Sequence, residues 1–106
     1  MASDRYDVKL TPQAEEDLAR LRSWTDQATL AILELEADPP RGHTLLGSLR
    51  GTRSLEFSLM GSGVHRALSV VLETDRVCLV FILGPHENIY DKARRRVAAL
   101  KRSGTI

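Results

Sequence analysis

The residues best suited to chemistry in this sequence are Arg66, His86 and Tyr90. Histidine exchanges a proton near neutral pH, which makes it the natural general acid or base. His86 follows Gly84-Pro85 at the expected end of a strand, and Tyr90 comes four residues later near the expected start of a helix. Both side chains can therefore overhang the same edge of a sheet. A lone histidine in this position is usually a surface or capping residue, and the company of Arg66 and Tyr90 is what favours a catalytic role.

Arg66 lies on a predicted strand in the same register as the apolar residues Leu68 and Val70. Its cation must stand at the sheet edge, pair with a carboxylate or bind an anionic ligand. Glu56, on the preceding predicted strand, is an available carboxylate. One hairpin register places Glu56 on the same face as Arg66 and the next does not, because side chains alternate along a strand. The sequence leaves that register open.

The cations are concentrated in the second part of the chain. Residues 1–40 hold 4 basic and 9 acidic side chains, whereas residues 41–106 hold 11 basic and 5 acidic, for a net charge of +1. Nine of these eleven cations are arginines, which suit bidentate contacts with phosphate, although a solvated arginine face is equally open. Arg94 stands one helical turn beyond Tyr90 and is the best placed of the helical arginines to reach a ligand.

The remaining histidines, His43 and His65, indicate no site of their own. His43 falls in a predicted loop and His65 should point away from Arg66, so both are interpreted as structural or solvent-exposed. No histidine has the closely spaced Cys, His or acidic partners that are typical of a metal site. The sequence therefore predicts neither a metal nor another cofactor, and it lacks the phosphate-binding loop and dinucleotide motifs of familiar enzyme classes.

Two helices are expected after a short N-terminal strand. Residues 6–10 alternate apolar and polar side chains, and Thr11-Pro12 supplies a cap and a first helical residue. Acidic residues at 15–17 then fall in the first turn, where the helix dipole favours negative charge. A second helix is expected from about Asp26, as its cap, to Ala37. The apolar positions expected to face the core are Ala14, Leu18, Leu21 and either Trp24 or Thr25 in the first helix, and Leu30, Leu33 and Ala37 in the second.

The second half of the sequence predicts an antiparallel meander and a final helix. Residues 41–53 show no periodicity and are expected to form an exposed, irregular loop. Strands are expected over 54–59, 64–73 and 76–83, the last of them apolar enough to be covered on both faces. With Thr74-Asp75 as a two-residue turn, Arg66 should lie opposite Leu83. Asn88 is a candidate N-cap for a last helix that carries an apolar stripe to Leu100, and the tail after Lys101 is expected to be frayed. The fold class is α+β.

The bulk properties limit the kind of protein this can be. A chain of 106 residues with 42% hydrophobic composition fits a single domain over residues 1–106. The sequence has one cysteine, Cys78, which falls in an apolar run. Because a disulfide needs two cysteines, none can form within the chain, and this favours a reducing cytoplasm. The longest apolar run, residues 77–83, is far below the roughly 20 residues needed to cross a bilayer, so we expect a cytoplasmic protein with no membrane partner.

Several short motifs in this order are similar to those of the RelE/ParE superfamily of type II toxins. The resemblance covers nearly the whole chain, from Tyr6 to about Leu100. It is carried by the run from Tyr6 to Leu18, by Leu49-Arg50-Gly51, by the strand with Arg66, and by Gly84 to Tyr90 before an arginine-rich helix. The resemblance implies a RelE-like fold, in which an N-terminal strand and helical hairpin pack on an antiparallel β-sheet meander with a C-terminal helix.

The resemblance also implies an activity and roles for individual residues. RelE-like members are endoribonucleases that cut messenger RNA at the ribosome and inhibit translation, with no metal cofactor. In such a reaction the 2′-hydroxyl attacks the adjacent phosphate, a base removes its proton, cations stabilise the phosphorane and an acid protonates the leaving oxygen. Carried over by position, Arg66 matches the arginine at the phosphate, and His86 and Tyr90 match positions for proton transfer or orientation. Glu56 is a candidate base, and Arg50, Arg53 and Arg94 are candidate RNA contacts.

The same resemblance leaves other functions open. ParE-like members poison DNA gyrase and would need no pair of His86 and Tyr90, and an inactive relative would only bind an antitoxin. The net charge of +1 is lower than is typical of ribosome-dependent members. In every case the expected partner is a cognate antitoxin, acidic and partly disordered, bound over the two N-terminal helices and the sheet edge, with a heterotetramer as one conceivable assembly.

Overall fold

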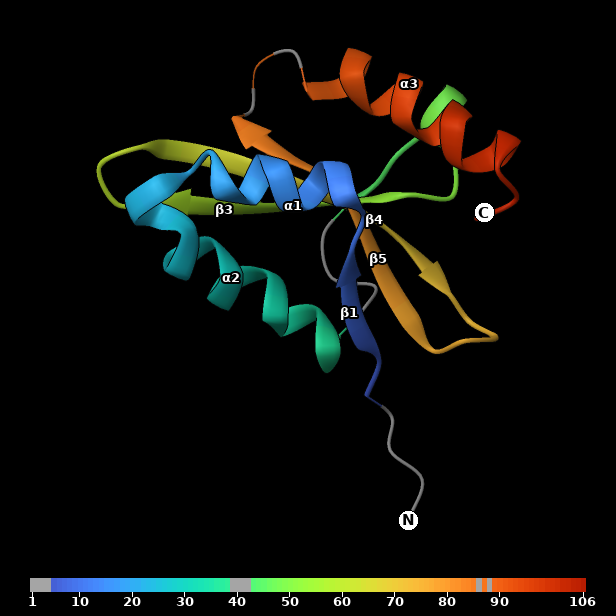
Figure 1. Cartoon of the computed structure of the whole chain (residues 1–106), viewed down its shortest axis with the longest axis horizontal. Helices are drawn as coiled ribbons and strands as arrows, with labels where there is room; N and C mark the ends of the chain where they lie inside the picture. Colours follow the sequence, from blue (N-terminus) through green and yellow to red (C-terminus); the bar gives the residue numbers. More distant parts are fainter. Residues whose placement is uncertain (1–4, 39–42, 86, 88) are drawn as a thin grey trace.

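The computed structural model describes residues 5–38, 43–85, 87 and 89–106. Within these ranges the chain forms a five-stranded sheet with the order β1-β5-β4-β3-β2 (Figure 1). The strands β2, β3, β4 and β5 form three antiparallel pairs, whereas β1 pairs in parallel with β5. This arrangement confirms the predicted α+β class with its antiparallel meander. The strands are β1 (Asp7–Leu10), β2 (His43–Thr44), β3 (Arg53–Leu59), β4 (Gly63–Leu72) and β5 (Val77–Pro85).

Helices cover both faces of the sheet: α1 (Pro12–Ala19) and α2 (Thr25–Leu33) on one side, α3 (Ile89–Arg102) on the other (Figure 1). β5 therefore contributes to two apolar cores, as its continuous apolar sequence predicted. The core under α1 and α2 contains Ala14, Ile32, Leu35, Leu55, Ala67, Cys78, Val80 and Leu83. The core under α3 contains Leu49, Leu68, Phe81, Ile82, Ile89, Ala93 and Val97.

The first helix begins where the sequence predicts it. The Oγ of Thr11 accepts a hydrogen bond from the backbone N–H of Ala14 at 3.2 Å, and Pro12 is the first helical residue. Ala14 is fully buried and Leu18 is partly buried against the same core.

No helix among the described residues is long and apolar enough to cross a membrane.

The second helix differs from its prediction in extent and in buried face. It begins at Thr25, so Asp26 lies within its first turn and is not its cap, and it ends as a 3-10 turn over Glu34–Glu36. The buried positions are Ala28, Ile32 and Leu35, whereas Leu30 is 69% exposed and Leu33 is 42% exposed. The predicted stripe of Leu30, Leu33 and Ala37 is therefore wrong. Both stripes have helical spacing, so the spacing alone does not decide which of them is buried.

Trp24 was expected in the core, but it lies partly exposed at the turn between α1 and α2. Its indole N–H donates to the carbonyl of Met60 at 2.7 Å, and the amide N–H of Met60 donates to Gln27 Oε1 at 3.2 Å. These bonds join the helical hairpin to the turn between β3 and β4. The aromatic side chain of Phe81, in contrast, is fully buried.

The strand registers decide which side chains can meet. Glu56 is directly opposite Arg66 in the pairing of β3 with β4, which answers the question that the sequence left open. Between β4 and β5 the predicted register holds from Leu72 to Ser69, and then a β-bulge shifts it by one residue. Arg66 therefore lies opposite Gly84, not Leu83 as predicted. β5 also extends to Pro85, past its predicted end at Leu83.

Two segments are more ordered than the sequence suggested. The part of the predicted loop that the structure describes contains β2 and a 3-10 turn at Gly47–Leu49, and Leu49 is buried. After α3, Gly104 adopts a φ of +77°, and the amide N–H of Thr105 donates to the carbonyl of Leu100 at 2.9 Å. This is a Schellman cap, which glycine favours because it has no Cβ to clash. The prediction of a frayed tail is therefore wrong.

Candidate functional site

Arg66 and Glu56 form an ion pair on the sheet face that α3 partly covers. The Nη2 of Arg66 lies 2.8 Å from Glu56 Oε2, and the Nη1 of Arg66 donates to Ser54 Oγ at 3.4 Å. The three residues share a face because Glu56 and Arg66 are cross-strand partners and Ser54 is two residues from Glu56. The side chain of Arg66 is 16% exposed and that of Glu56 is 48% exposed. The carboxylate is thus open to solvent while the cation is held beneath it.

Tyr90 joins this pair from the first turn of α3. The guanidinium carbon of Arg66 lies 5.9 Å from the centroid of the Tyr90 ring, within the range of a cation–π contact. The neighbouring Ile89 is buried in the core under α3 and holds this end of the helix against the sheet. Residues from β3, β4 and α3 therefore converge, as the sequence predicted for Arg66 and Tyr90.

One predicted site residue that the structure describes, Arg94, stands apart from the convergence of Glu56, Arg66 and Tyr90. His86 lies outside the described residues. Arg94 is exposed on α3, and its Nη1 lies 2.6 Å from Asp91 Oδ1, so an exposed ion pair already engages it. Its predicted place one turn beyond Tyr90 is confirmed by the extent of α3.

The structure does not bring Arg53 together with Arg66. Arg53 begins β3 in alternation with Leu55 and Phe57, which places it on the opposite face of the sheet from Glu56. Arg50 is exposed and follows the buried Leu49, next to the core under α3. The alternation along β3 therefore separates Arg53 from the face that carries Glu56 and Arg66.

Of the other two histidines, His65 points away from Arg66 as the sequence predicted, whereas His43 lies on the short strand β2 and not in a loop. His65 is 3% exposed and lies on the face opposite Arg66, where its Nδ1 is 3.2 Å from the carbonyl of Gly63. Its ring also stacks on Phe57 with 6.2 Å between centroids. His43 is exposed on β2. His65 is therefore buried and His43 lies on the surface.

Sequence reasoning missed a buried ion pair between Asp17 of α1 and Arg96 of α3. Arg96 Nη1 lies 2.5 Å from Asp17 Oδ2, and the two side chains are only 18% and 4% exposed. Asp17 was interpreted as part of an acidic first turn, but it is buried. A signal was present, because Arg96 stands three residues after Ala93 and seven after Ile89, on the apolar stripe of its helix. A charge at a stripe position indicates a buried partner.

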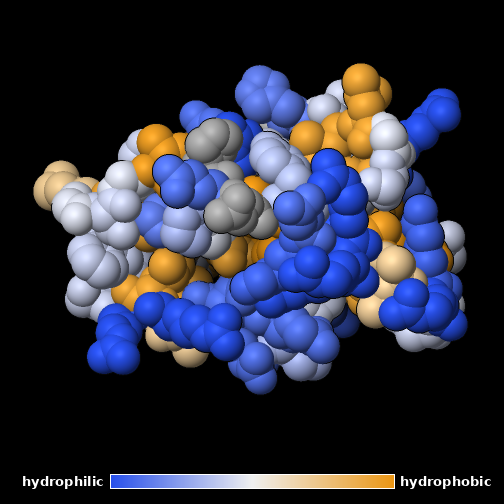
Figure 2. Space-filling view, turned by 90° about the horizontal axis from the view of Figure 1, so that it is seen from above, coloured by the Kyte–Doolittle hydropathy of each residue, from blue (hydrophilic) through white to orange (hydrophobic). Residues whose placement is uncertain are grey.

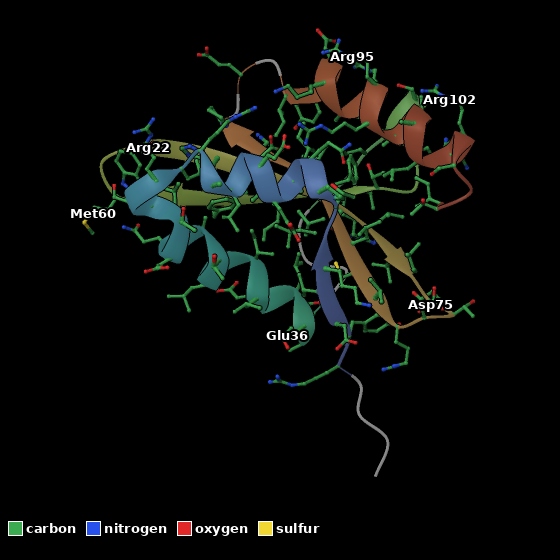
Figure 3. The ribbon with its side chains drawn as sticks, viewed as in Figure 1. Arg22, Glu36, Met60, Asp75, Arg95 and Arg102 are labelled. Atoms are coloured by element: carbon green, nitrogen blue, oxygen red, sulfur yellow. The ribbon has the colours of Figure 1, made fainter. Side chains whose placement is uncertain are left out.

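A groove of about 440 Å³ lies between α1 and the start of α3, and Asp17 is one of the residues that line it. Gly84, the cross-strand partner of Arg66, contributes to its wall, as does Ile89 beside Tyr90. From above, hydrophilic side chains gather along α3 with smaller hydrophobic areas beside them (Figure 2). Arg95 and Arg102 project from α3 away from the sheet (Figure 3). The full lining is Asp17, Arg20, Leu21, Trp24, Ser62, His65, Ile82, Leu83, Gly84, Pro85, Glu87, Ile89 and Lys92.

The chemical capacity of the cluster follows from its three groups. Glu56 can accept a proton, Arg66 can stabilise negative charge on an oxygen, and Tyr90 can donate an O–H hydrogen bond. Glu56 is open to solvent beside the start of α3, and Arg66 and Tyr90 are partly exposed next to it. An anionic ester is the kind of substrate that this combination suits.

Comparison with known proteins gives structural matches only: no family model and no curated protein sequence matches this chain. The RelBE2 toxin–antitoxin complex of Mycobacterium tuberculosis matches at 23% identity and a TM-score of 0.65, over 79% of this chain and 94% of that one. A mutant RelE toxin of E. coli in the free state matches at 17% identity and a TM-score of 0.67, over 92% and 97%. The archaeal RelE–RelB complex of Pyrococcus horikoshii matches at 18% identity and a TM-score of 0.54, over 79% and 98%. The chain therefore has the fold of the RelE toxins.

Proposed function

We propose that this protein is the toxin of a type II toxin–antitoxin pair and that it acts as an endoribonuclease on messenger RNA. The observation that carries the proposal is the convergence of Glu56, Arg66 and Tyr90 at an accessible edge of a RelE fold. The fold alone would not distinguish an enzyme from a protein that only binds a partner. A base, a cation and a hydroxyl in one cluster are what RNA cleavage requires.

In the proposed reaction Glu56 is the general base. Its exposed carboxylate removes the proton of the ribose 2′-hydroxyl, which then attacks the adjacent phosphorus. Arg66 binds a non-bridging phosphate oxygen and stabilises the charge that develops on the phosphorane. The reaction breaks the bond to the 5′-oxygen and yields a 2′,3′-cyclic phosphate.

Tyr90 and His86 take the two remaining roles in the proposed reaction, at the phosphate and at the leaving group. Tyr90 hydrogen-bonds to the phosphate beside Arg66, and His86 donates the proton to the departing 5′-oxygen. Arg94 and Arg50 add contacts to neighbouring phosphates from the α3 side of the sheet. Arg53, on the other face, is left out of the catalytic contacts and can hold only a distant part of the RNA or ribosome.

The test is induced expression in a bacterium of the wild type and the variants Arg66→Ala, Glu56→Gln and Tyr90→Phe, each beside the surface control Arg95→Ala. Growth and the 5′ ends of transcripts, mapped by primer extension, are read together. We expect growth arrest with new transcript ends for the wild type and the control, and loss of both for Arg66→Ala. Arrest without new transcript ends would overturn RNA cleavage and indicate gyrase or another protein target. No arrest in the wild type would indicate an inactive, antitoxin-binding relative.

The proposed partner is a cognate antitoxin. Solved structures similar to this chain include toxin–antitoxin complexes from M. tuberculosis and P. horikoshii. Co-expression with the neighbouring gene should restore growth and yield a complex that purifies together. A chain that stays unbound beside its neighbour's product would contradict this part of the proposal.

A further inference from the structure

The ion pair of Asp17 and Arg96 is bidentate and nearly buried. Arg96 Nη1 donates to Asp17 Oδ2 at 2.5 Å and Nη2 donates to Oδ1 at 3.1 Å. The exposed Arg20 is a more distant cation, 3.9 Å from Asp17 Oδ1. A buried pair of this kind rarely adds much net stability, because desolvation offsets the attraction between the charges. Its position in the fold indicates what else it does.

Both side chains also bind the backbone of β5. The amide N–H of Leu83 donates to Asp17 Oδ2 at 3.1 Å, and Arg96 Nη1 donates to the carbonyl of Phe81 at 3.0 Å. The neighbouring strand β1 ends at Leu10, opposite Val80, and the amide N–H of the next residue, Thr11, donates to the carbonyl of Val80. Beyond the end of β1, the side chains of Asp17 and Arg96 form hydrogen bonds with backbone groups of β5 that no longer face β1.

This contact coincides with the bulge that sets the position of Arg66. Leu68 lies opposite Ile82 and Ser69 opposite Val80, which leaves Phe81 as the extra residue on β5. Arg96 holds the carbonyl of that extra residue. Because of the bulge, Arg66 lies opposite Gly84. The pair therefore fixes the irregular part of β5 next to the partner of the proposed phosphate-binding arginine.

The same contact fixes α3 against β5 on the C-terminal side of Tyr90. Arg96 lies six residues after Tyr90, and the buried Ile89 fixes the helix on the other side. A shift or rotation of α3 would move the Tyr90 ring away from Arg66, where the present separation is 5.9 Å. Three elements, α1, β5 and α3, thus meet at one hydrogen-bonded group.

We propose that Asp17 and Arg96 are positioning residues for RNA cleavage: by clamping the bulge of β5 to α1 and α3, they hold Tyr90 over Arg66. This inference rests on the proposed function. Neither residue touches the substrate. Loss of the clamp should lower the rate of the cleavage step much more than the affinity for RNA, because displacement of reacting groups by about 1 Å can cost on the order of 100-fold in rate.

The test compares Arg96→Met with two control variants on α3. Val97→Ala removes apolar packing from the same buried stripe without touching the pair, and Arg95→Met removes an exposed arginine. Cleavage of a synthetic messenger RNA, free and bound to ribosomes, is measured under single-turnover conditions at a temperature at which circular dichroism shows every variant to be folded. Binding of the same RNA is measured separately.

We expect the cleavage rate of Arg96→Met to fall at least about tenfold with RNA affinity changed less than about threefold, and both controls to cleave within about threefold of the wild type. Combining Arg96→Met with Tyr90→Phe should cost much less than the product of the two single effects, because the first change already displaces the tyrosine. Additive effects, or an equal loss in Val97→Ala, would overturn the positioning role and leave the pair as a part of general packing.

Hydrogen exchange makes the result independent of the proposed reaction. In Arg96→Met the Leu83 amide and the amides of the first turns of α3 should exchange faster than in Val97→Ala. If the wild type cuts no RNA, the proposed function fails, and hydrogen exchange alone then decides whether the clamp positions α3. Unchanged exchange at Leu83 and in α3 would overturn the clamp itself, whatever the activity.

Discussion

At the scale of single residues, Arg66 is the position on which the most depends. Its guanidinium reaches Glu56, Ser54 and the ring of Tyr90 from a side chain that is mostly shielded from water. A planar fork with several donors can hold neighbours in place and still offer hydrogen bonds to a phosphate, whereas an ammonium group is a compact point charge. Side-chain identity, and not charge alone, should therefore matter here.

We predict that Arg66→Lys keeps the fold but lowers the cleavage rate by about 10- to 100-fold, because lysine cannot bind Glu56 and a phosphate in the same fork-like geometry. The thermal midpoint should stay close to that of the wild type, because Glu56 is half exposed and such pairs contribute about 0–1 kcal/mol. Transcript cleavage and thermal unfolding measure the two effects. An unfolded Arg66→Lys protein would instead make this arginine a structural partner.

Cys78 gives a second prediction at the same scale. It is fully buried in the core under α1 and α2, and burial raises the pKa of its thiol. Since the thiolate is the reactive form, the native protein should react with a disulfide reagent such as DTNB far more slowly than the unfolded chain at the same pH. Labelling measured along a urea titration should rise together with the unfolding transition. Fast labelling of the native protein would contradict the buried position.

At the scale of elements, α2 shows how two apolar stripes can compete for one core. Ile32 is 2% exposed and packs on the sheet, whereas Leu30, two positions earlier, is 69% exposed. The sequence pattern alone did not separate them. The contact of α2 with β3 decided which stripe is buried, because α2 has to fit against side chains that come from distant parts of the chain.

This assignment predicts different costs for two similar truncations. Ile32→Ala should lower the free energy of unfolding by about 2–5 kcal/mol, because it removes buried methylene groups and leaves a cavity. Leu30→Ala should change it by less than about 0.5 kcal/mol, as is usual for an exposed position. Urea unfolding of both variants compares them directly, and equal losses would show that Leu30 packs against the core as well as Ile32.

At the scale of the whole molecule, the apolar side chains left on the surface indicate where a partner could bind. Leu30 and Leu33 are exposed on α2, and Met60, which is 86% exposed, follows β3 at the turn bonded to Gln27 of the same helix (Figure 3). The N-terminal helices were the expected antitoxin surface, and the exposed leucines lie on the second of them. Apolar groups on one exposed helix face suit a segment that folds on binding.

We predict that Leu30→Glu combined with Leu33→Glu weakens binding of the neighbouring gene's product at least about tenfold, while the variant still folds. The change places two charges where an apolar contact is expected, and both positions already face solvent in the free protein. Ala99→Glu, at an exposed site on α3, is the matched control. Isothermal titration of the three proteins measures the effect. A loss confined to Ala99→Glu would move the antitoxin surface to α3.

The sequence by itself determined the order and type of most elements. The capped start at Thr11-Pro12, the alternation over 54–59 and the apolar stripe of Ile89, Ala93 and Val97 each depend on local rules that act within a few residues. The same local patterns placed Arg66 on a strand and Tyr90 at a helix start. They also carried the resemblance that the RelE fold then confirmed.

Only the tertiary structure decided how these elements meet. The register that pairs Glu56 with Arg66, the bulge that moves Arg66 opposite Gly84 and the clamp of Asp17 and Arg96 all join residues far apart in the chain. A one-residue shift of register reverses the face of every side chain on a strand, and no local signal excludes it. The register is decided by the packing of the whole core and by the need of each buried charge and backbone group for a partner. Both conditions involve residues from the whole molecule and not from any one segment.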